Sequence, residues 1–314
     1  MDYDVFNGDA DGILSLVQMR LADPREDAVL VTGRKRDVKL LSRVPAGEGD
    51  RVTVLDIAMR SNTDDLNRIL ADGAEVVYFD HHNPGDIPDH PNLDATINTA
   101  GEICTAVLVD QRLKGAYRGW AVAAAYGDNF PAMAERLANG TDLPLSILRE
   151  LGEMVNYNGY GGSEADLHYH PADLYNSMAG FETPMAFLAA KPDVIETLTE
   201  GYHNDFDLAD QSKVVFASDD CEARVLPDAA GSRRVSGMFG NQLAQDNPNR
   251  AHAILTEQEG GFLVSIRAPI SKRAGADTLA LQFETGGGRA AAAGINHLPE
   301  SDLDRFIEAF RTSF

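Results

Sequence analysis

About the first 80 residues of the chain repeat one pattern, in which a short apolar run ends at polar residues and a helix-like stretch follows. The apolar runs have the length of β-strands and lie at residues 3–6, 28–31, 51–55 and 74–79. Strand-sized runs separated by helix-sized segments favour βα units, whose strands form a parallel sheet with helices on both faces. The pattern therefore predicts an α/β fold for this part of the chain.

A different pattern begins near residue 190. A helix candidate follows residue 191 and ends near residue 212. Alternating, strand-like segments then begin at residues 214, 221, 251 and 261, and a last helix is expected at 301–310. We therefore expect an α/β chain with a parallel-sheet domain at residues 1–190, a helical linker at 191–214 and a smaller mixed α/β domain at 215–314.

Acidic and histidine side chains follow three of the four N-terminal strands, whereas a basic segment, residues 34–39, follows the second strand. The acidic and histidine side chains belong to Asp9 and Asp11, to Asp56, and to Asp80, His81 and His82. In a parallel sheet the ligand crevice lies beyond the carboxyl ends of the strands. We therefore expect these six side chains to meet in one site.

The chemistry of such a site follows from its charge. Carboxylates that lie close together repel one another unless cations offset them, and mixed Asp and His ligands suit Mn²⁺ or a related divalent ion. Two such ions a few ångströms apart stabilise both the attacking and the leaving oxygen of a displacement at phosphorus, and they lower the pKa of a bridging water. The six side chains therefore predict hydrolysis of a phosphate ester or anhydride.

Four segments of the chain resemble, in order and spacing, the four motifs of the DHH phosphoesterase family: FNGDADG, VLDIA, FDHHNP and AYGDN. The later segments VSIRAP and GGGRAAAAGI resemble the substrate-binding domain associated with that family. The resemblance is to the oligoribonuclease and phosphoadenosine-phosphate phosphatase type and, more distantly, to RecJ-type exonucleases. It implies that residues 1–190 form the metal-binding catalytic domain and residues 215–314 the substrate-binding domain.

The resemblance also implies roles for single residues around two Mn²⁺ ions, with Mg²⁺ or Co²⁺ as alternatives. Asp9 would bind the first ion, Asp56 would bridge both, and Asp11, His81 and Asp128 would bind the second. His82 would act as an acid or contact the scissile phosphate, and Asp80 would orient a histidine.

The substrate contacts are expected in the C-terminal domain. Arg267 follows an apolar run, so we expect it to be buried and to need an anionic partner, which the resemblance implies is a substrate phosphate. Gly286, Gly287 and Gly288 are expected to form a loop whose backbone approaches a phosphate, next to Arg289. Val5 and Arg289 depart from the family pattern, which often has a histidine at each position.

The composition limits the partners. The chain has 27 Lys and Arg against 49 Asp and Glu, a net charge of -22, whereas proteins that follow long nucleic acids normally present a basic surface. Residues 215–314 carry 10 basic and 13 acidic side chains, a net charge of -3, and residues 1–214 carry the remaining 17 and 36, a net charge of -19. We therefore expect a short oligonucleotide or nucleotide as substrate, no long nucleic acid and no membrane partner. A cytoplasmic location is expected because the N-terminus lacks a secretory signal, and a homodimer remains open.

The sequence thus predicts a Mn²⁺-dependent phosphodiesterase that hydrolyses short oligonucleotides or linear dinucleotides to mononucleotides through a two-metal-activated water. Two related activities remain open, a phosphatase for 3′-phosphoadenosine 5′-phosphate and a cyclic-dinucleotide phosphodiesterase. A catalytically weak nucleotide-binding regulatory protein is the alternative that is not an enzyme, and only Val5 and Arg289 support it. An inorganic pyrophosphatase would need a different basic C-terminal signature.

Overall fold

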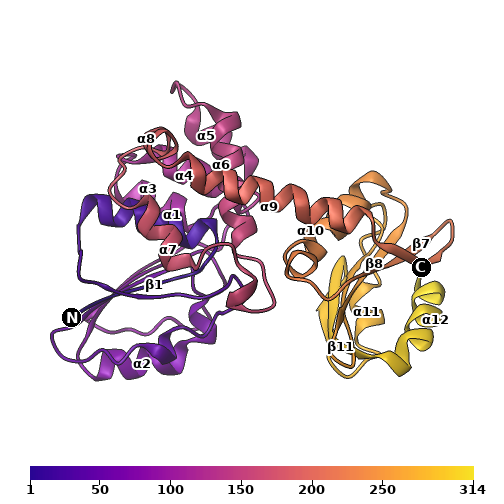
Figure 1. Cartoon of the computed structure of the whole chain (residues 1–314). Helices are drawn as coiled ribbons and strands as arrows, with labels where there is room; N and C mark the ends of the chain where they lie inside the picture. Colours follow the sequence, from indigo (N-terminus) through magenta and orange to yellow (C-terminus); the bar gives the residue numbers. More distant parts are fainter. The chain divides into compact units, whose positions relative to one another are not determined.

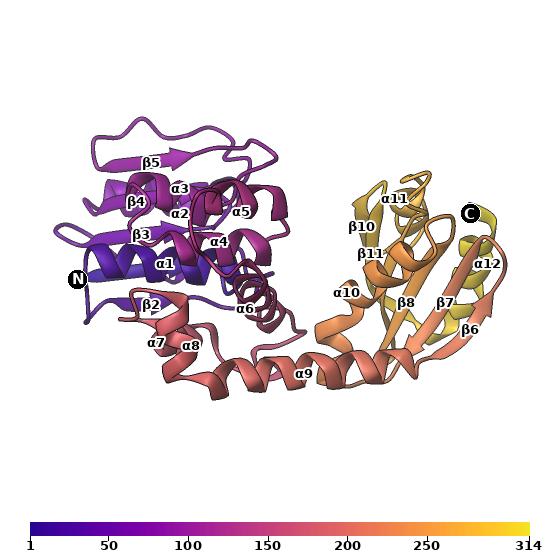
Figure 2. The same cartoon turned by 90° about the horizontal axis from the view of Figure 1, so that it is seen from above.

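The computed structural model describes all residues from Met1 to Phe314, in two compact units, Met1–Thr199 and Glu200–Phe314. The boundary between the units falls within helix α9 (Pro192–Asp210), the long helix near the middle of the colour scale in Figures 1 and 2. None of the helices combines the length and the apolar character that crossing a membrane would require.

The first unit contains a five-stranded, all-parallel sheet with the strand order β2-β1-β3-β4-β5. Its strands are β1 (Asp2–Phe6), β2 (Val29–Val31), β3 (Arg51–Leu55), β4 (Glu75–Asp80) and β5 (Leu93–Ile97). The four apolar runs in the sequence correspond to β1 to β4, which confirms the predicted parallel α/β fold. Strand β5 was not predicted, because this edge strand is only partly buried and carries polar residues such as Asp94 and Thr96.

Helices cover both faces of this sheet, as the sequence predicts (Figure 1). The helices of this unit are α1 (Ala10–Ala22), α2 (Thr63–Ala71), α3 (Thr105–Arg112), α4 (Arg118–Gly127), α5 (Pro131–Ala138), α6 (Leu145–Asn158), α7 (Pro171–Met178) and α8 (Pro184–Ala190). Helix α2 lies on one face, where Leu66, Ile69 and Leu70 pack in the same core cluster as the valines of β3 and β4. Helix α1 lies on the other face, and nearly all of it is buried, since α3 and α4 pack against it. Both faces of the sheet are therefore buried, and a ligand site is expected at the carboxyl ends of its strands.

The second unit contains a mixed six-stranded sheet with the order β10-β11-β9-β8-β7-β6, in which only β7 and β8 pair in parallel. The strands are β6 (Lys213–Ala217), β7 (Cys221–Leu226), β8 (Ala251–Gln258), β9 (Gly261–Arg267), β10 (Gly286–Arg289) and β11 (Ala292–Pro299). Its helices are α10 (Ala230–Asp246), α11 (Ala276–Ala280) and α12 (Leu303–Ser313). The smaller mixed α/β fold predicted for this region is confirmed.

One prediction in this unit is wrong. Gly286, Gly287 and Gly288 do not form a loop; together with Arg289 they form β10, which pairs antiparallel with β11. The physical reason is close backbone packing within the protein. A Cβ atom on Gly286 would lie 1.8 Å from the carbonyl oxygen of Ala280, and Gly288 has a φ of +145°, a conformation that other residues rarely adopt.

Candidate metal centre

The carboxyl ends of β1, β3 and β4 place the predicted acids and histidines at one edge of the parallel sheet. Asp9 and Asp11 lie in the turn from β1 into α1, and Asp56 directly follows β3. Asp80 is the last residue of β4, and His81 and His82 follow it, while Asp128 follows the end of α4. All except His82 are largely removed from solvent.

His81 is at the centre of this cluster. Its Nε2 atom lies 3.4 Å from Oδ1 of Asp56, 3.6 Å from Oδ2 of Asp128 and 3.9 Å from Oδ2 of Asp11. Two sets of ligand atoms lie within 4.8 Å of one another: one from Asp11, His81 and Asp128, the other from Asp56, His81 and His82. The structure thus brings together the four residues that the sequence predicts around the second ion.

Backbone groups hold these ligands in place. The two carboxylate oxygens of Asp11 each accept a 2.7 Å hydrogen bond from a backbone N–H at the start of α3, from Thr105 and Ala106. The Nδ1 atom of His81 lies 2.9 Å from the carbonyl oxygen of Ile103. Because a carbonyl oxygen only accepts, Nδ1 donates and the lone pair of Nε2 faces the carboxylates, which is the orientation that a metal-binding histidine requires.

Asp56 is held in a strained backbone conformation. Its φ is 58°, in the left-handed region that residues with a side chain rarely enter, and its N–H donates to the carbonyl oxygen of Phe79 at 3.0 Å. Its Oδ1 accepts a hydrogen bond from the Thr105 hydroxyl at 3.2 Å. Strain of this kind costs on the order of 1–3 kcal/mol and persists where the surrounding structure imposes it, which is common in functional sites.

The cluster carries more negative charge than its own cations neutralise. Burial raises the pKa of Asp56 well above its ordinary value, and the neighbouring carboxylates of Asp11 and Asp9 raise it further. Burial and the same two carboxylates raise the pKa of Asp128 to about 7, although the nearby ammonium of Lys35 opposes them. A carboxylate cluster with raised pKa values is stabilised by an added cation.

The residues present fit a divalent cation. The donor set combines carboxylate oxygens with an imidazole nitrogen, which suits Mn²⁺ and related ions. Two buried acceptors beside the ligands, Oδ2 of Asp80 and Oδ1 of Asn7, have no hydrogen-bond partner. Buried acceptors without a partner are costly, so their presence next to the acids agrees with a site that is completed by a ligand.

His82 differs from His81 in its exposure and its partner. Its side chain is 45% exposed, and its Nδ1 atom lies 2.7 Å from Oδ1 of Asp80, which is fully buried. The hydrogen bond that His82 donates to Asp80 raises the pKa of His82, although burial opposes this effect. Asp80 also accepts the N–H of His81 at 2.9 Å, so one carboxylate fixes both histidines.

Sequence reasoning missed Lys35, which lies in the basic segment after β2. Its Nζ atom lies 2.7 Å from Oδ2 of Asp9 and 3.4 Å from Oδ1 of Asp128. Burial raises the pKa of Asp9, but the ammonium of Lys35 more than offsets this and holds that pKa below its ordinary value. A signal was available, because β2 ends at the same sheet edge as the acid-bearing strands and a basic segment follows it directly.

The predicted substrate contacts lie in the second unit. Arg267 of β9 and Arg289 of β10 are both direct cross-strand partners of Ala292 on β11. Direct partners in an antiparallel pair project from the same face of a sheet, so the two arginines lie in one row with the small side chain of Ala292 between them. The structure therefore brings these two predicted residues together.

The burial expected for Arg267 is wrong, because its side chain is partly exposed. Its guanidinium donates to Oδ1 of Asn241 at 2.5 Å and to the carbonyl oxygen of Gly237 at 3.0 Å, both on α10. Arg267 packs against the glycines of α10: a Cβ atom on Gly237 or Gly240 would lie 3.4 or 3.5 Å from it. Neutral oxygens thus orient the guanidinium while part of it remains open to solvent.

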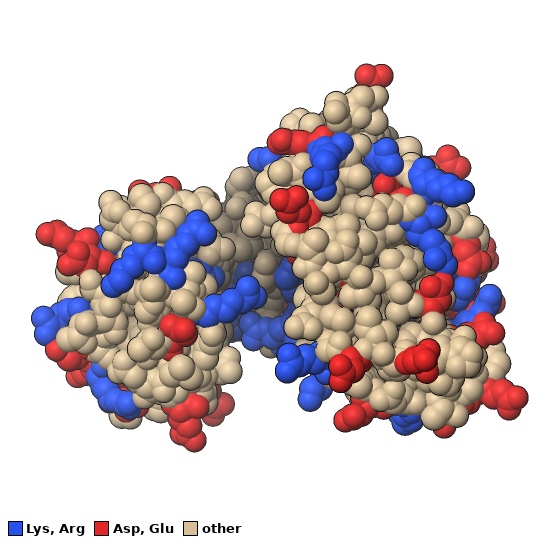
Figure 3. All heavy atoms as spheres, turned by 180° about the vertical axis from the view of Figure 1, so that it is seen from behind, with Lys and Arg blue, Asp and Glu red and all other residues tan.

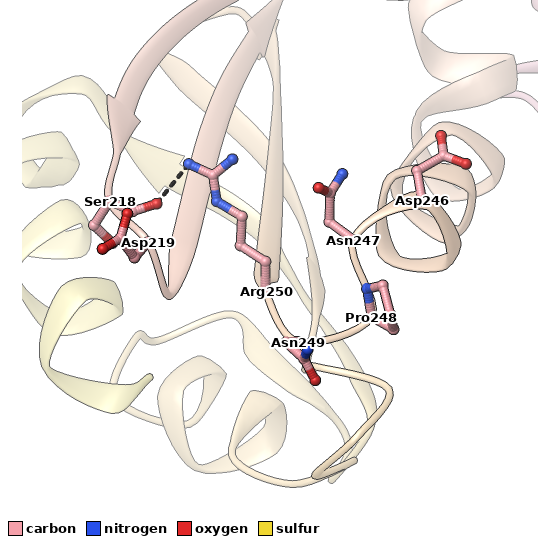
Figure 4. Close-up of a pocket in the computed structure, with 7 residues that line it drawn as sticks. All are labelled: Ser218, Asp219, Asp246, Asn247, Pro248, Asn249 and Arg250. Atoms are coloured by element: carbon pink, nitrogen blue, oxygen red, sulfur yellow. Dashed lines mark hydrogen bonds between the residues drawn. The ribbon is translucent and has the colours of Figure 1, made fainter.

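A separate polar cavity of about 390 Å³ also lies in the second unit (Figure 4). It is lined by Ser218, Asp219, Asp246, Asn247, Pro248, Asn249 and Arg250. Arg250 donates to the carbonyl oxygen of Ser218 and to Oε2 of Glu222, each at 2.6 Å. The cavity contains none of the predicted site residues, and its one cationic side chain already has an anionic partner, so it is not the candidate centre.

The fold is similar to that of solved DHH-domain proteins, and the predicted resemblance is confirmed at the level of the fold. No protein-family model matches the sequence, and no curated protein matches it. A solved DHH-domain structure, described as that of a member of a family of ribosomal proteins, aligns with a TM-score of 0.68 and 14% identity, over 99% of this chain and 85% of that chain.

Two further solved structures carry enzyme names. Exonuclease RecJ bound to manganese aligns with a TM-score of 0.64 and 17% identity, over 99% of this chain and 89% of that chain. The pGpG-specific phosphodiesterase PggH from Vibrio cholerae aligns with a TM-score of 0.57 and 20% identity, over 99% of this chain and 98% of that chain. At these identities the likeness establishes the fold.

Proposed function

We propose that the chain is a divalent-metal-dependent phosphodiesterase that hydrolyses linear dinucleotides or other very short oligonucleotides to mononucleotides. The observation that carries the proposal is the position of His81, whose Nε2 lies within 3.4 to 3.9 Å of carboxylate oxygens of Asp11, Asp56 and Asp128. Two similar folds are named as an exonuclease and a pGpG-specific phosphodiesterase, and the first was solved with manganese. These names support a phosphodiester as the substrate and Mn²⁺ as the ion.

The roles of the residues follow from their positions. Asp11, Asp56, His81 and Asp128 would hold the cation. When bound, a divalent ion polarises a phosphate oxygen and lowers the pKa of a water molecule. Asp80 holds the Nδ1 side of His82, so Nε2 would be the atom of the protonated, nearly half-exposed ring that donates a proton to the leaving oxygen. Arg267 and Arg289 would hold a second phosphate group of the substrate, because guanidinium groups pair well with phosphate oxygens.

The charge distribution supports a short substrate. Figure 3 shows Lys and Arg interspersed with Asp and Glu on the visible face of each unit, with no continuous basic track. A net charge of -22 disfavours the binding of long nucleic acids, which depends on basic side chains and counterion release. A short substrate needs only the local positive charge of the metal centre and a few arginines.

The test is hydrolysis of pGpG, a mixed-sequence RNA dinucleotide, 3′-phosphoadenosine 5′-phosphate, a cyclic dinucleotide and a 24-nucleotide single strand, each with Mn²⁺, Mg²⁺ or Co²⁺. We expect mononucleotide release from the dinucleotides, strongest with Mn²⁺, and loss of that release in Asp56→Ala. If only the phosphoadenosine phosphate or only the cyclic dinucleotide is hydrolysed, that compound would replace the dinucleotide as the proposed substrate. Nucleotide binding without hydrolysis of any substrate would reject the enzyme and favour the regulatory alternative.

A further inference from the structure

Asp9 behaves differently from the other predicted metal ligands. It belongs to neither set of clustered ligand atoms around His81. Its Oδ1 accepts the N–H of Gly12 at 3.0 Å and thereby caps the start of α1, and its Oδ2 is bound by the ammonium of Lys35 at 2.7 Å. Both oxygens of this 2% exposed residue are therefore engaged by groups of the protein. Asp11 also accepts two hydrogen bonds, but from neutral backbone N–H groups, whereas Asp9 is paired with a cation.

Lys35 is surrounded by groups that favour a cation. Besides Asp9, its Nζ lies 3.4 Å from Oδ1 of Asp128 and donates to Oδ1 of Asn156 at 3.0 Å. It also lies 5.6 Å from the centre of the Tyr160 ring, within the range of a cation–π interaction. An ammonium has three donors, and two carboxylates, an amide oxygen and an aromatic ring are available to it here.

The backbone of Lys35 is fixed at this place. Its N–H donates to the carbonyl oxygen of Gly159 at 3.0 Å, and its carbonyl oxygen accepts from Nδ2 of Asn7 at 3.3 Å. The segment before it approaches the turn that carries Asp9 so closely that a Cβ atom on Gly8 would lie 1.8 Å from the carbonyl oxygen of Gly33. Lys35 is therefore built into the centre by the fold, unlike a flexible surface lysine.

The family pattern often has a histidine shortly before Asp9, and this chain has none there. Val5, four residues earlier, is fully buried in the hydrophobic core of the sheet together with Tyr3 and Val54. A cation at Asp9 would thus have one carboxylate oxygen that is already bound to an ammonium, and a hydrocarbon side chain where a ligand is needed. Positive charge at this position is supplied by the chain itself.

We propose that the Lys35 ammonium takes the place of one of the two cations, so that the chain binds a single divalent ion, at Asp11, Asp56, His81 and Asp128. This inference deepens the proposed function and rests on the metal centre assigned there. An ammonium provides positive charge and N–H donors but does not coordinate water. Lys35 would therefore neutralise Asp9 and donate to a phosphate oxygen, while activation of water depends on the single ion.

The test is the number of Mn²⁺ ions bound per chain, measured without substrate by calorimetric titration and by electron paramagnetic resonance. We expect one ion and a mononuclear signal for the wild type. Lys35→Met should bind two ions and give a spin-coupled signal, because Oδ2 of Asp9 becomes free and Asn7 has an unpartnered oxygen nearby in the sequence. Lys35→Arg keeps the charge and should bind one ion.

Lys39→Met is the matched control, because Lys39 is an exposed lysine of the same segment and should leave the count at one. Two ions in the wild type, or one ion in a folded Lys35→Met, would overturn the inference. If Lys35→Met does not fold, as judged by its thermal melting, the wild-type count decides alone. A chain that binds one ion but hydrolyses nothing refutes the proposed function only, whereas one that hydrolyses dinucleotides with two bound ions refutes only the role of Lys35.

Discussion

Oδ1 of Asp80 lies 2.7 Å from Nδ1 of His82 and 2.9 Å from the backbone nitrogen of His81, so one fully buried carboxylate holds two neighbouring histidines. The two rings then face different partners. His81 turns its Nε2 towards three carboxylates, whereas His82 is nearly half exposed. This division supports the proposed roles, in which His81 would bind the ion and His82 would transfer a proton.

The first prediction concerns this carboxylate. Asp80→Asn should lower kcat by about 10- to 100-fold, the usual cost of removing a group that orients a site histidine. Because Asp80 raises the pKa of His82, the substitution should lower that pKa. The acid form of His82 is then lost at lower pH, so the alkaline limb of the kcat profile should shift to lower pH. Asp86→Asn, at an exposed position after the histidines, is the control; an unshifted alkaline limb in Asp80→Asn would contradict the role of His82.

The second prediction is that binding of the ion releases protons. Burial and neighbouring carboxylates raise the pKa of Asp128 to about 7 and also raise that of Asp56. A bound cation should therefore displace a proton from Asp128 at pH 6, and the raised pKa of Asp56 acts in the same direction. Titrations of Mn²⁺ in buffers of different ionisation enthalpy should show more protons released at pH 6 than at pH 8.5. Asp128→Asn should release fewer protons at pH 6 than the wild type. Heats that do not depend on the buffer would contradict the prediction.

The same raised pKa affects stability. A carboxyl whose pKa is higher in the folded than in the unfolded chain contributes stability that is complete below the unfolded value, 3.8, and is lost as the pH rises through the folded value. We therefore expect the melting temperature of the metal-free protein to fall between pH 5.5 and 8.5, because the carboxyls of this cluster ionise over that range. Saturating Mn²⁺ should remove most of that fall, because it binds the ionised form. A larger fall with Mn²⁺ than without it would contradict the assignment.

The close approach of two glycines gives the fourth prediction. Gly8→Ala would place a Cβ atom 1.8 Å from the carbonyl oxygen of Gly33, a rigid backbone atom, so the two segments must separate. We expect a loss of about 1–3 kcal/mol in the free energy of unfolding, or more, measured by urea denaturation. Gly101→Ala is the control, since no atom lies within 4 Å of its Cβ position. Equal stability of the two variants would show that the two segments can move apart at little cost.

The sequence predicted the helices and strands whose apolar residues recur with the period of that element. It failed for elements whose structure depends on contacts between distant segments. Strand β3 has the predicted bounds, and β7 begins at the predicted residue 221. Helix α10 was not predicted, since its three glycines, Gly231, Gly237 and Gly240, lower its helix propensity. Strand β10 was expected as a loop because glycines resemble a turn locally, whereas its pairing with β11 depends on residues further along the chain.

The candidate site likewise contains residues that the sequence predicted and residues that it did not. The ligands around His81 were predictable, because each follows a recognisable strand or motif and the topology of a parallel sheet brings strand ends together. Lys35 was missed although the basic segment after β2 pointed to it, because its exact place depends on hydrogen bonds to Gly159 and Asn7. The partial exposure of Arg267 depends on how α10 packs, which is likewise a contact between distant segments.

The last prediction tests the row of arginines in the second unit. If Arg267 and Arg289 hold a phosphate group of the substrate remote from the reacting bond, Arg289→Ala should raise KM about 10-fold and change kcat much less, because it removes binding that the ground state and the transition state share. Binding of Mn²⁺ should not change, since the ligands lie in the first unit. Arg311→Ala, an exposed arginine of α12 paired with Glu308, is the matched control. A fall in kcat at unchanged KM would instead place Arg289 at the reacting phosphate, and unchanged kinetics would remove it from the site.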